Sequence, residues 1–212
     1  MEVPDRWRAA VGAQLRHPHG LPGLVVGRVL NHYNKAVIAE AVSALDIPPG
    51  AMLADFGFGG GTGLELLLAA LDDGGQVHGV DHSTAMLGAA ARKFARQIST
   101  GLLVLHEAPL EHLPLETSSL DGVITLNTIY FISDLAVALS EWARVLKPSG
   151  QLVIGLGDPD TMATQPLTAH GFRVRPLTEV TNALLSAGLE VDQHRLIGTG
   201  EHATHLLVAQ PY

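Results

Sequence analysis

Apolar residues along this chain form short runs that alternate with longer segments of helical periodicity. The short runs are predicted to be buried strands: Ala51–Phe56, Gln76–Val80, Leu102–His106, Asp121–Leu126 and Gln151–Leu156. The longer segments are predicted to be helices: Leu24–Leu45, Leu64–Leu71, Ser83–Gln97 and Asp134–Val145. Strands that alternate with helices of this length predict a parallel sheet covered by helices on both faces.

The last part of the chain has a different pattern. Thr178–Ala187 is predicted to be a helix, and Leu189–Ile197 and Ala203–Ala209 are predicted to be strands joined only by Gly198–His202. A parallel crossover needs a dozen residues or more, so these two strands are expected to pair as an antiparallel hairpin. Gly157–Pro176 lacks a periodic pattern, and we expect a long loop that forms part of an acceptor-binding wall.

A glycine-rich turn joins the first predicted strand to the next helix. It reads Asp55-x-Gly57-x-Gly59-x-Gly61. Glycine lets the backbone approach a ligand closely, and the helix N-terminus directs free N–H groups at that ligand. The dinucleotide fingerprint requires a third glycine five residues after the first, but Thr62 occupies that position after Gly57 and no other frame fits. The lysine of a phosphate-binding loop is also absent. The pattern therefore disfavours a nicotinamide-dependent oxidoreductase.

The acidic residue followed by alternate glycines resembles the first motif of the class I S-adenosylmethionine (SAM) dependent methyltransferases. Further matches follow in the order of that family: Leu110–Pro114 with Ser119–Val123, Asn127–Phe131, and Arg144–Gly150, which resembles an "RVLKPGG" turn with Ser149 in place of its first glycine. Leu15–Gly20 matches an "LR-x-P-x-G" stretch of small bacterial methyltransferases of the ubiquinone/menaquinone-biosynthesis type. The resemblance covers residues from about 15 to 210.

This resemblance implies a Rossmann-like, doubly wound α/β fold. We expect a seven-stranded, mostly parallel sheet that ends in an antiparallel hairpin. We also expect SAM as the cofactor and S-adenosylhomocysteine (SAH) as its product. The whole chain is interpreted as a single methyltransferase domain, with an N-terminal helical cap at 1–48, a SAM-binding core at 49–156, and the acceptor loop, helix and hairpin at 157–212.

Composition narrows the classes of partner. Hydrophobic residues make up 47% and charged residues 16% of the 212 positions, which is typical of a globular protein. The formal net charge of -8 and the scattered Lys and Arg residues argue against nucleic acid or an anionic membrane as the main partner. Cysteine is absent, the N-terminus lacks the apolar core of a signal peptide, and no apolar run approaches the ~18 residues of a membrane span. We expect a cytoplasmic protein.

The predicted cofactor-binding residues lie mainly at the carboxyl ends of the expected strands, where open α/β sheets bind ligands. Asp81 is expected to accept hydrogen bonds from both ribose hydroxyls. Asn127 is expected to hold the ammonium group of the methionine moiety. The family places an acidic residue and a backbone N–H at the adenine edge, here Glu107 and Ala108. For Glu107 a solvated loop position is the alternative. The full predicted set is Asp55, Gly57, Phe58, Gly59, Gly61, Asp81, His82, Met86, Glu107, Ala108, Asn127, Tyr33 and Asn34.

Several of these roles have open alternatives. His82 and Met86 could flank the adenine, but Met86 could equally be a core residue. The family closes its cofactor pocket with the N-terminal helix, so His32, Tyr33 and Asn34 are candidate lid residues.

Methyl transfer from a sulfonium is an in-line displacement, for which the protein mainly supplies alignment and desolvation. A hydroxyl acceptor also needs a base, because its proton must leave as the O–C bond forms. The histidines that could reach the carboxyl face are His32, His170 and His202. Tyr130 could line the methyl-transfer site, where an aromatic face favours a sulfonium, or it could be a core tyrosine. These four residues are the predicted catalytic set, and the histidines favour O-methylation.

The acceptor is expected to be a small hydroxylated metabolite such as a sugar, polyketide or quinone. The alternatives are C- or N-methylation and a SAM-binding protein without transfer activity. No metal is expected, because His17-Pro18-His19 and Asp158-Pro159-Asp160 match no closed ligand set. Several relatives dimerise, which leaves a homodimer open.

Overall fold

The computed structural model describes residues 34–72, 74–165, 168 and 171–212. The predicted lid and base residues His32, Tyr33 and His170 lie outside the described residues, as do the Leu15–Gly20 match and residues 24–33 of the helix expected at Leu24–Leu45. Within the part that is described, residues 34–43 are helical, in agreement with that prediction. Among the helices of these described ranges, none is long and apolar enough to cross a membrane.

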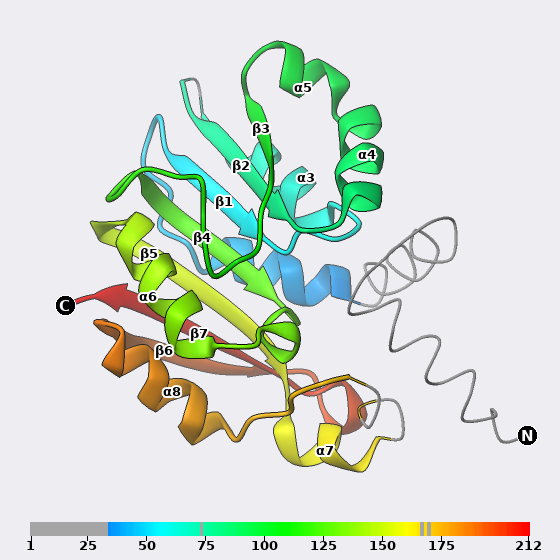
Figure 1. Cartoon of the computed structure of the whole chain (residues 1–212), viewed down its shortest axis with the longest axis vertical. Helices are drawn as coiled ribbons and strands as arrows, with labels where there is room; N and C mark the ends of the chain where they lie inside the picture. The colour runs from blue at the N-terminus through cyan, green and yellow to red at the C-terminus, as the bar shows by residue number, and fades with distance from the viewer. Residues whose placement is uncertain (1–33, 73, 166–167, 169–170) are drawn as a thin grey trace, which may run out of the picture.

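Seven strands form one sheet in the order β3-β2-β1-β4-β5-β7-β6 (Figure 1). The strands are β1 (Met52–Phe56), β2 (Gln76–Asp81), β3 (Leu103–Glu107), β4 (Leu120–Leu126), β5 (Leu146–Gly157), β6 (Leu189–Ile197) and β7 (Thr204–Pro211). β1 to β5 pair in parallel, whereas β7 runs antiparallel to both β5 and β6. The predicted fold class is confirmed, including the C-terminal hairpin.

Helices cover both faces of this sheet (Figure 1). They are α3 (Thr62–Ala70), α4 (Thr84–Lys93), α5 (Ala95–Ser99), α6 (Leu135–Val145), α7 (Pro159–Thr164) and α8 (Leu177–Ser186), with 3₁₀ turns η1 (Ile129–Phe131) and η2 (Gly200–His202). The helix at 34–43 shares one hydrophobic core with α3 and α4. The helices α6 and α8 share the other. The order of strands reverses between β1 and β4, which is where doubly wound sheets bind their ligands.

Alternation along β1 decides which side chains reach the glycine turn. Ala54 and Phe56 belong to the core under α6, where the Phe56 ring lies 5.8 Å from that of Trp142. Leu53 belongs to the opposite core. Successive side chains of a strand point to opposite faces, so Asp55 shares the face of Leu53, under α3. The strand therefore places one buried carboxyl directly beneath the turn that follows it.

One predicted helix and one predicted strand have different bounds in the structure. The helix expected at Ser83–Gln97 is interrupted at Phe94, whose φ of -110° and ψ of 26° separate α4 from α5. Phe94 is 4% exposed, and its ring faces Gly61, so burial of this ring stops the helix. The strand expected at Gln151–Leu156 begins earlier, at Leu146, because Leu146 already pairs with Leu120 of β4, before a shift in register that ends at the pair of Gly122 with Gln151.

The expected loop at Gly157–Pro176 was partly wrong, because it contains α7. The Asp158 carboxylate accepts a hydrogen bond from the Thr161 N–H at 2.9 Å, and Pro159 occupies the first turn. An acidic N-cap followed by proline is a recognised helix start. The helix has only six residues, so it has no apolar period to reveal it.

Candidate functional site

Three glycines of the turn after β1 adopt left-handed backbone angles. The φ values are 72° at Gly57, 48° at Gly59 and 78° at Gly61. Residues other than glycine rarely adopt these backbone angles. The alternate spacing of the glycines therefore follows from the positive φ that the turn requires at every second position. The turn is held by the Gly57 N–H, which donates to the Val80 carbonyl at 2.8 Å, and by the Gly61 N–H, which donates to the Phe58 carbonyl at 2.9 Å.

The turn is also packed from two sides. A Cβ on Gly57 would lie 2.7 Å from Cγ2 of Thr128, and a Cβ on Gly61 would lie 3.1 Å from the Phe94 ring. Thr128 follows β4 and Phe94 follows α4. The glycine turn is therefore the meeting point of three segments that are distant in sequence.

Asp81 contacts this turn from the end of β2. Its carboxylate accepts a hydrogen bond from the Gly59 N–H at 3.0 Å and another from the Ser83 N–H at 2.9 Å. The side chain is buried, and burial raises the pKa of the Asp81 carboxyl while hydrogen bonds from the backbone N–H groups of Ser83, Gly59 and His82 lower it. A carboxylate has about four lone-pair sites, so some acceptor capacity remains for a hydroxyl donor of a ligand.

Asp55 forms a second buried carboxyl under the same turn. Burial and the nearby charge of Asp81 raise the pKa of Asp55 to about 8, against a hydrogen bond from the Leu64 N–H that lowers it. Two buried carboxyl groups in such proximity favour a cationic ligand, because a positive charge stabilises their ionised forms. The methionine moiety of the predicted cofactor carries an ammonium group and a sulfonium.

The ends of β3 and β4 complete this edge of the sheet. Glu107 is exposed and pairs in register with Asp81, so the two acidic residues end adjacent strands. The Ala108 N–H donates to the Asp81 carbonyl at 3.2 Å. The predicted hydrogen bond of this N–H to adenine would have to replace that bond. Asn127 has a φ of 57°, and its N–H donates to the Gly155 carbonyl at 2.8 Å.

Tyr130 has the surroundings of the core tyrosine that the sequence left as an alternative. It is 3% exposed, and its hydroxyl accepts a hydrogen bond from the Gly157 N–H at 2.5 Å. The hydroxyl also lies 3.5 Å from Oδ1 of Asn127. Burial raises the pKa of this phenol above its usual range. Its predicted contact with the transferred methyl group stays a prediction.

The remaining predicted residues divide into buried core residues and exposed residues. Met86 and Phe58 are 1% and 3% exposed and belong to the core under α3 and α4, which agrees with the packing alternative for Met86. His82 is exposed beside Asp81, and His202 is exposed in η2. Asn34 begins the described helix at 34–43. Just beyond the other end of this helix, Leu45 packs against Gly122 near the start of β4.

Sequence reasoning missed one hydrogen-bonded chain near the end of β5. Oδ2 of Asp158 lies 3.1 Å from Nε2 of His205, and Nδ1 of His205 lies 2.7 Å from Nε2 of His194. Hydrogen bonds from Thr161 and His205 lower the pKa of Asp158 to about 2. His205 lies on β7 opposite Leu156 of β5, a pairing that no local sequence pattern indicates. Within the described ranges, no group of three or more His, Cys, Asp and Glu could hold a metal ion.

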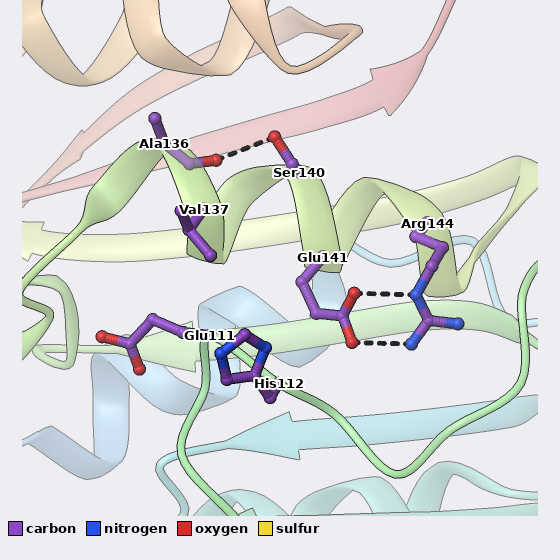
Figure 2. A pocket seen from close by; sticks show the side chains of 7 residues that line it. All are labelled: Glu111, His112, Ala136, Val137, Ser140, Glu141 and Arg144. Atoms are coloured by element: carbon purple, nitrogen blue, oxygen red, sulfur yellow. Dashed lines mark hydrogen bonds and ion pairs between the residues drawn. The ribbon is translucent and has the colours of Figure 1, made fainter.

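A separate open pocket of about 520 Å³ lies along the outer side of α6 (Figure 2). Its lining residues are Glu111, His112, Ala136, Val137, Ser140, Glu141 and Arg144, none of which is a predicted site residue. Arg144 donates to both Glu141 oxygens at 2.7 Å and to the Leu115 carbonyl at 3.0 Å. These polar contacts hold the connection between β3 and β4 against α6, so Arg144 has a structural role.

Comparisons with known proteins agree with this geometry. Residues 54–154 match a family model described as a methyltransferase domain, and this segment contains the glycine turn, Asp81 and Asn127. Residues 54–154 thus match a methyltransferase domain, of the class I SAM-dependent type that the sequence predicts. The predicted family and its cofactor, SAM, are confirmed.

Two relatives of this methyltransferase domain differ in the atom that they methylate. An O-methyltransferase of Pyrenophora dematioidea is 30% identical over 66% of this chain and 61% of its own length. The ubiquinone/menaquinone biosynthesis C-methyltransferase of Syntrophotalea carbinolica is 38% identical over 53% of this chain and 46% of its own length. The chain thus spans less than two thirds of these relatives.

A solved structure shares the fold of this methyltransferase domain. The geranyl diphosphate C-methyltransferase of Streptomyces coelicolor A3(2), in complex with Mg²⁺, geranyl diphosphate and SAH, matches with a TM-score of 0.70. The match covers 92% of this chain and 87% of that chain at 18% identity.

The contact between Gly63 and Asp55 gives a test of the packing under the turn. A Cβ on Gly63 would overlap the Asp55 carboxylate and lie 3.0 Å from Ile124. We expect Gly63→Ala to lower the free energy of unfolding by about 1–3 kcal/mol in urea titrations, because the core cannot absorb the added methyl without strain.

Gly88→Ala is the matched control, because Gly88 also lies in a helix but a Cβ there would meet only Arg92, at 3.8 Å. The control should gain about 0.5–1 kcal/mol from the higher helix propensity of alanine. Equal effects of the two substitutions would contradict the close packing of Gly63 on Asp55.

The raised pKa of Asp55 predicts that the free energy of unfolding of the ligand-free protein depends on pH. The pKa is about 8 in the folded state and 3.8 for an unperturbed group, so between these values the folded state binds a proton that the unfolded state has released. The contribution of Asp55 to stability is therefore present at low pH and is lost as the pH rises towards 8.

Asp55→Asn removes this titration. The free energy of unfolding of the variant minus that of wild type should increase between pH 5 and pH 8, measured by urea titration across that range. A difference that is independent of pH would show that Asp55 ionises normally in the folded protein.

Proposed function

We propose that this protein is an enzyme that transfers the methyl group of SAM to a hydroxyl oxygen of a small molecule. The observation that supports SAM binding most directly is the Asp81 carboxylate, which Gly59 and Ser83 hold beside the glycine turn. Its remaining acceptor capacity suits a ribose hydroxyl. The buried Asp55 carboxyl, close enough for its charge to interact with Asp81, suits the positively charged methionine moiety.

Transfer activity is favoured over simple SAM binding by a cluster of polar groups that we assign to the acceptor side. The ends of β4 and β5 bring Asn127, Tyr130 and Gly157 together through the Tyr130 hydroxyl. Asp158 follows directly, and its carboxylate accepts a hydrogen bond from the His205 imidazole. These groups lie at the carboxyl end of the sheet, beside the strand ends that hold the glycine turn.

A hydroxyl acceptor is supported by the exposed His202, which lies in η2 near the end of β5, where the Asp158 N–H donates to the Ala203 carbonyl at 2.9 Å. A histidine there could accept the hydroxyl proton as the new O–C bond forms. The similarity to an O-methyltransferase agrees with this proposal. C-methylation is the second candidate, which the similarity to C-methyltransferases favours. Cytoplasmic location and a homodimer stay predictions.

The proposal is tested with SAM that carries a ¹³C-labelled methyl group and a panel of sugar, polyketide and quinol acceptors. We expect an O-methyl product, which the chemical shift of the labelled carbon distinguishes from C- or N-methyl products. Asp81→Asn should raise the KM for SAM about 10–100-fold, because hydrogen bonds to a charged group contribute about 1.5–3 kcal/mol.

Asp46→Asn is the matched control, since Asp46 is exposed and precedes β1, at the opposite end of the sheet. It should leave the KM unchanged. A C-methyl product would overturn the O-methylation proposal and retain the enzyme class. An inability of wild type to bind SAH, together with binding of nicotinamide nucleotides, would contradict the whole assignment.

A further inference from the structure

Four backbone carbonyls of the turn that follows β4 accept hydrogen bonds from a distant segment. Within residues 128–133, the Phe131 N–H donates to the Thr128 carbonyl at 3.0 Å. The carbonyls of the turn are instead satisfied by Arg173 and Arg175, which precede α8. The Arg173 N–H donates to the Tyr130 carbonyl at 2.9 Å, and its guanidinium donates to the Ser133 carbonyl.

Arg175 is the buried part of this arrangement. Its side chain is 7% exposed, although arginine is rarely buried without partners. Nη1 donates to the Ile129 carbonyl at 2.6 Å and Nη2 to the Ile132 carbonyl at 2.9 Å, while Nε lies 3.4 Å from Glu179, whose side chain is 56% exposed. The rigid fork of the guanidinium thus spans the two ends of η1.

The position of this turn is transmitted to the cofactor side. Thr128 begins the turn, and its side chain occupies the space where a Cβ of Gly57 would lie. Its hydroxyl lies 3.3 Å from the Phe56 carbonyl and 3.1 Å from the Leu126 carbonyl. Asn127, with its left-handed φ of 57°, connects β4 to the same turn. Any shift of η1 therefore displaces Asn127 and the packing of the glycine turn.

We propose that Arg175 is a positioning residue for SAM: by bridging the Ile129 and Ile132 carbonyls it fixes the turn that orients Asn127 and supports the glycine turn. Arg175 does not touch the cofactor in this account. The inference rests on the proposed function, since it concerns binding of the same cofactor. It assigns to the segment before α8 a part in cofactor binding, in addition to the acceptor-binding wall that the sequence predicts there.

The test is calorimetric titration of SAH into Arg175→Ala, at a temperature where the variant is fully folded by circular dichroism. We expect affinity to fall at least tenfold. Guanidinium chloride at low millimolar concentration should recover part of this loss, because the free ion can reoccupy the cavity between the two carbonyls. If Arg175→Ala does not fold, Arg175→Lys replaces it, since an ammonium group keeps the charge but cannot bridge both carbonyls.

Arg144→Ala is the matched control. Arg144 also donates to backbone carbonyls, those of Leu113 and Leu115, but it anchors the connection between β3 and β4 and not η1. This control should lose stability, keep wild-type affinity for SAH and show no response to guanidinium. Wild-type affinity in Arg175→Ala, or equal losses in both variants without recovery by guanidinium, would overturn the positioning role.

The two proposals fail in different ways. If wild type itself does not bind SAH, the proposed function fails. Hydrogen exchange at residues 128–133 still decides whether Arg175 holds the turn, because exchange should accelerate there in Arg175→Ala and not in Arg144→Ala. Unchanged exchange in Arg175→Ala would overturn the inference independently of SAH.

Discussion

The structure depends on the close packing of the glycine turn against its neighbours. Asp55 lies beneath the turn, Thr128 lies against Gly57, and Phe94 lies against Gly61. Each contact requires a position without a side chain, and three of the glycines also require positive φ. Because the turn is confined on these sides, its N–H groups and the first residues of α3 have a fixed direction. The ends of β1 and β4 are positioned by the same contacts.

This confinement has an electrostatic cost in the ligand-free protein. Asp55 and Asp81 are both buried, with 4% and 5% of their surface exposed, and the pKa of each is raised. Such a pair is poorly suited to stability alone, since burial disfavours the charged forms. A bound cation would reverse that preference. The arrangement is typical of a binding site whose buried charged groups lower the stability of the free protein and raise its affinity for a ligand.

Much of the fold could be predicted from sequence because its signals are local. The hairpin followed from the short Gly198–His202 connection, and β6 was predicted with the bounds that the structure has. The position of Asp81 followed from its place at the end of a strand in a parallel sheet. The α7 helix was missed because six residues contain too little periodicity, although Asp158 and Pro159 mark its start. The break at Phe94 arises from tertiary burial, which local propensity does not report.

The candidate site was less predictable because several of its contacts join distant segments. Arg175 contacts Ile129 across 46 positions, and His205 contacts Asp158 across 47. Neither pair has a spacing that a motif could reveal. The roles of Phe58 and Met86 could not be separated from core packing either, since a buried apolar side chain beside a ligand has the same sequence signature as one in the core.

The central claim is that one ligand site joins the glycine turn to the ends of β2, β3 and β4. Amide chemical shift mapping with SAH tests it most directly. The account predicts perturbations concentrated at Gly57–Gly63, Asp81–Ser83, Glu107–Ala108 and Asn127–Tyr130. Perturbations confined to the pocket along α6, or none at saturating SAH, would contradict it.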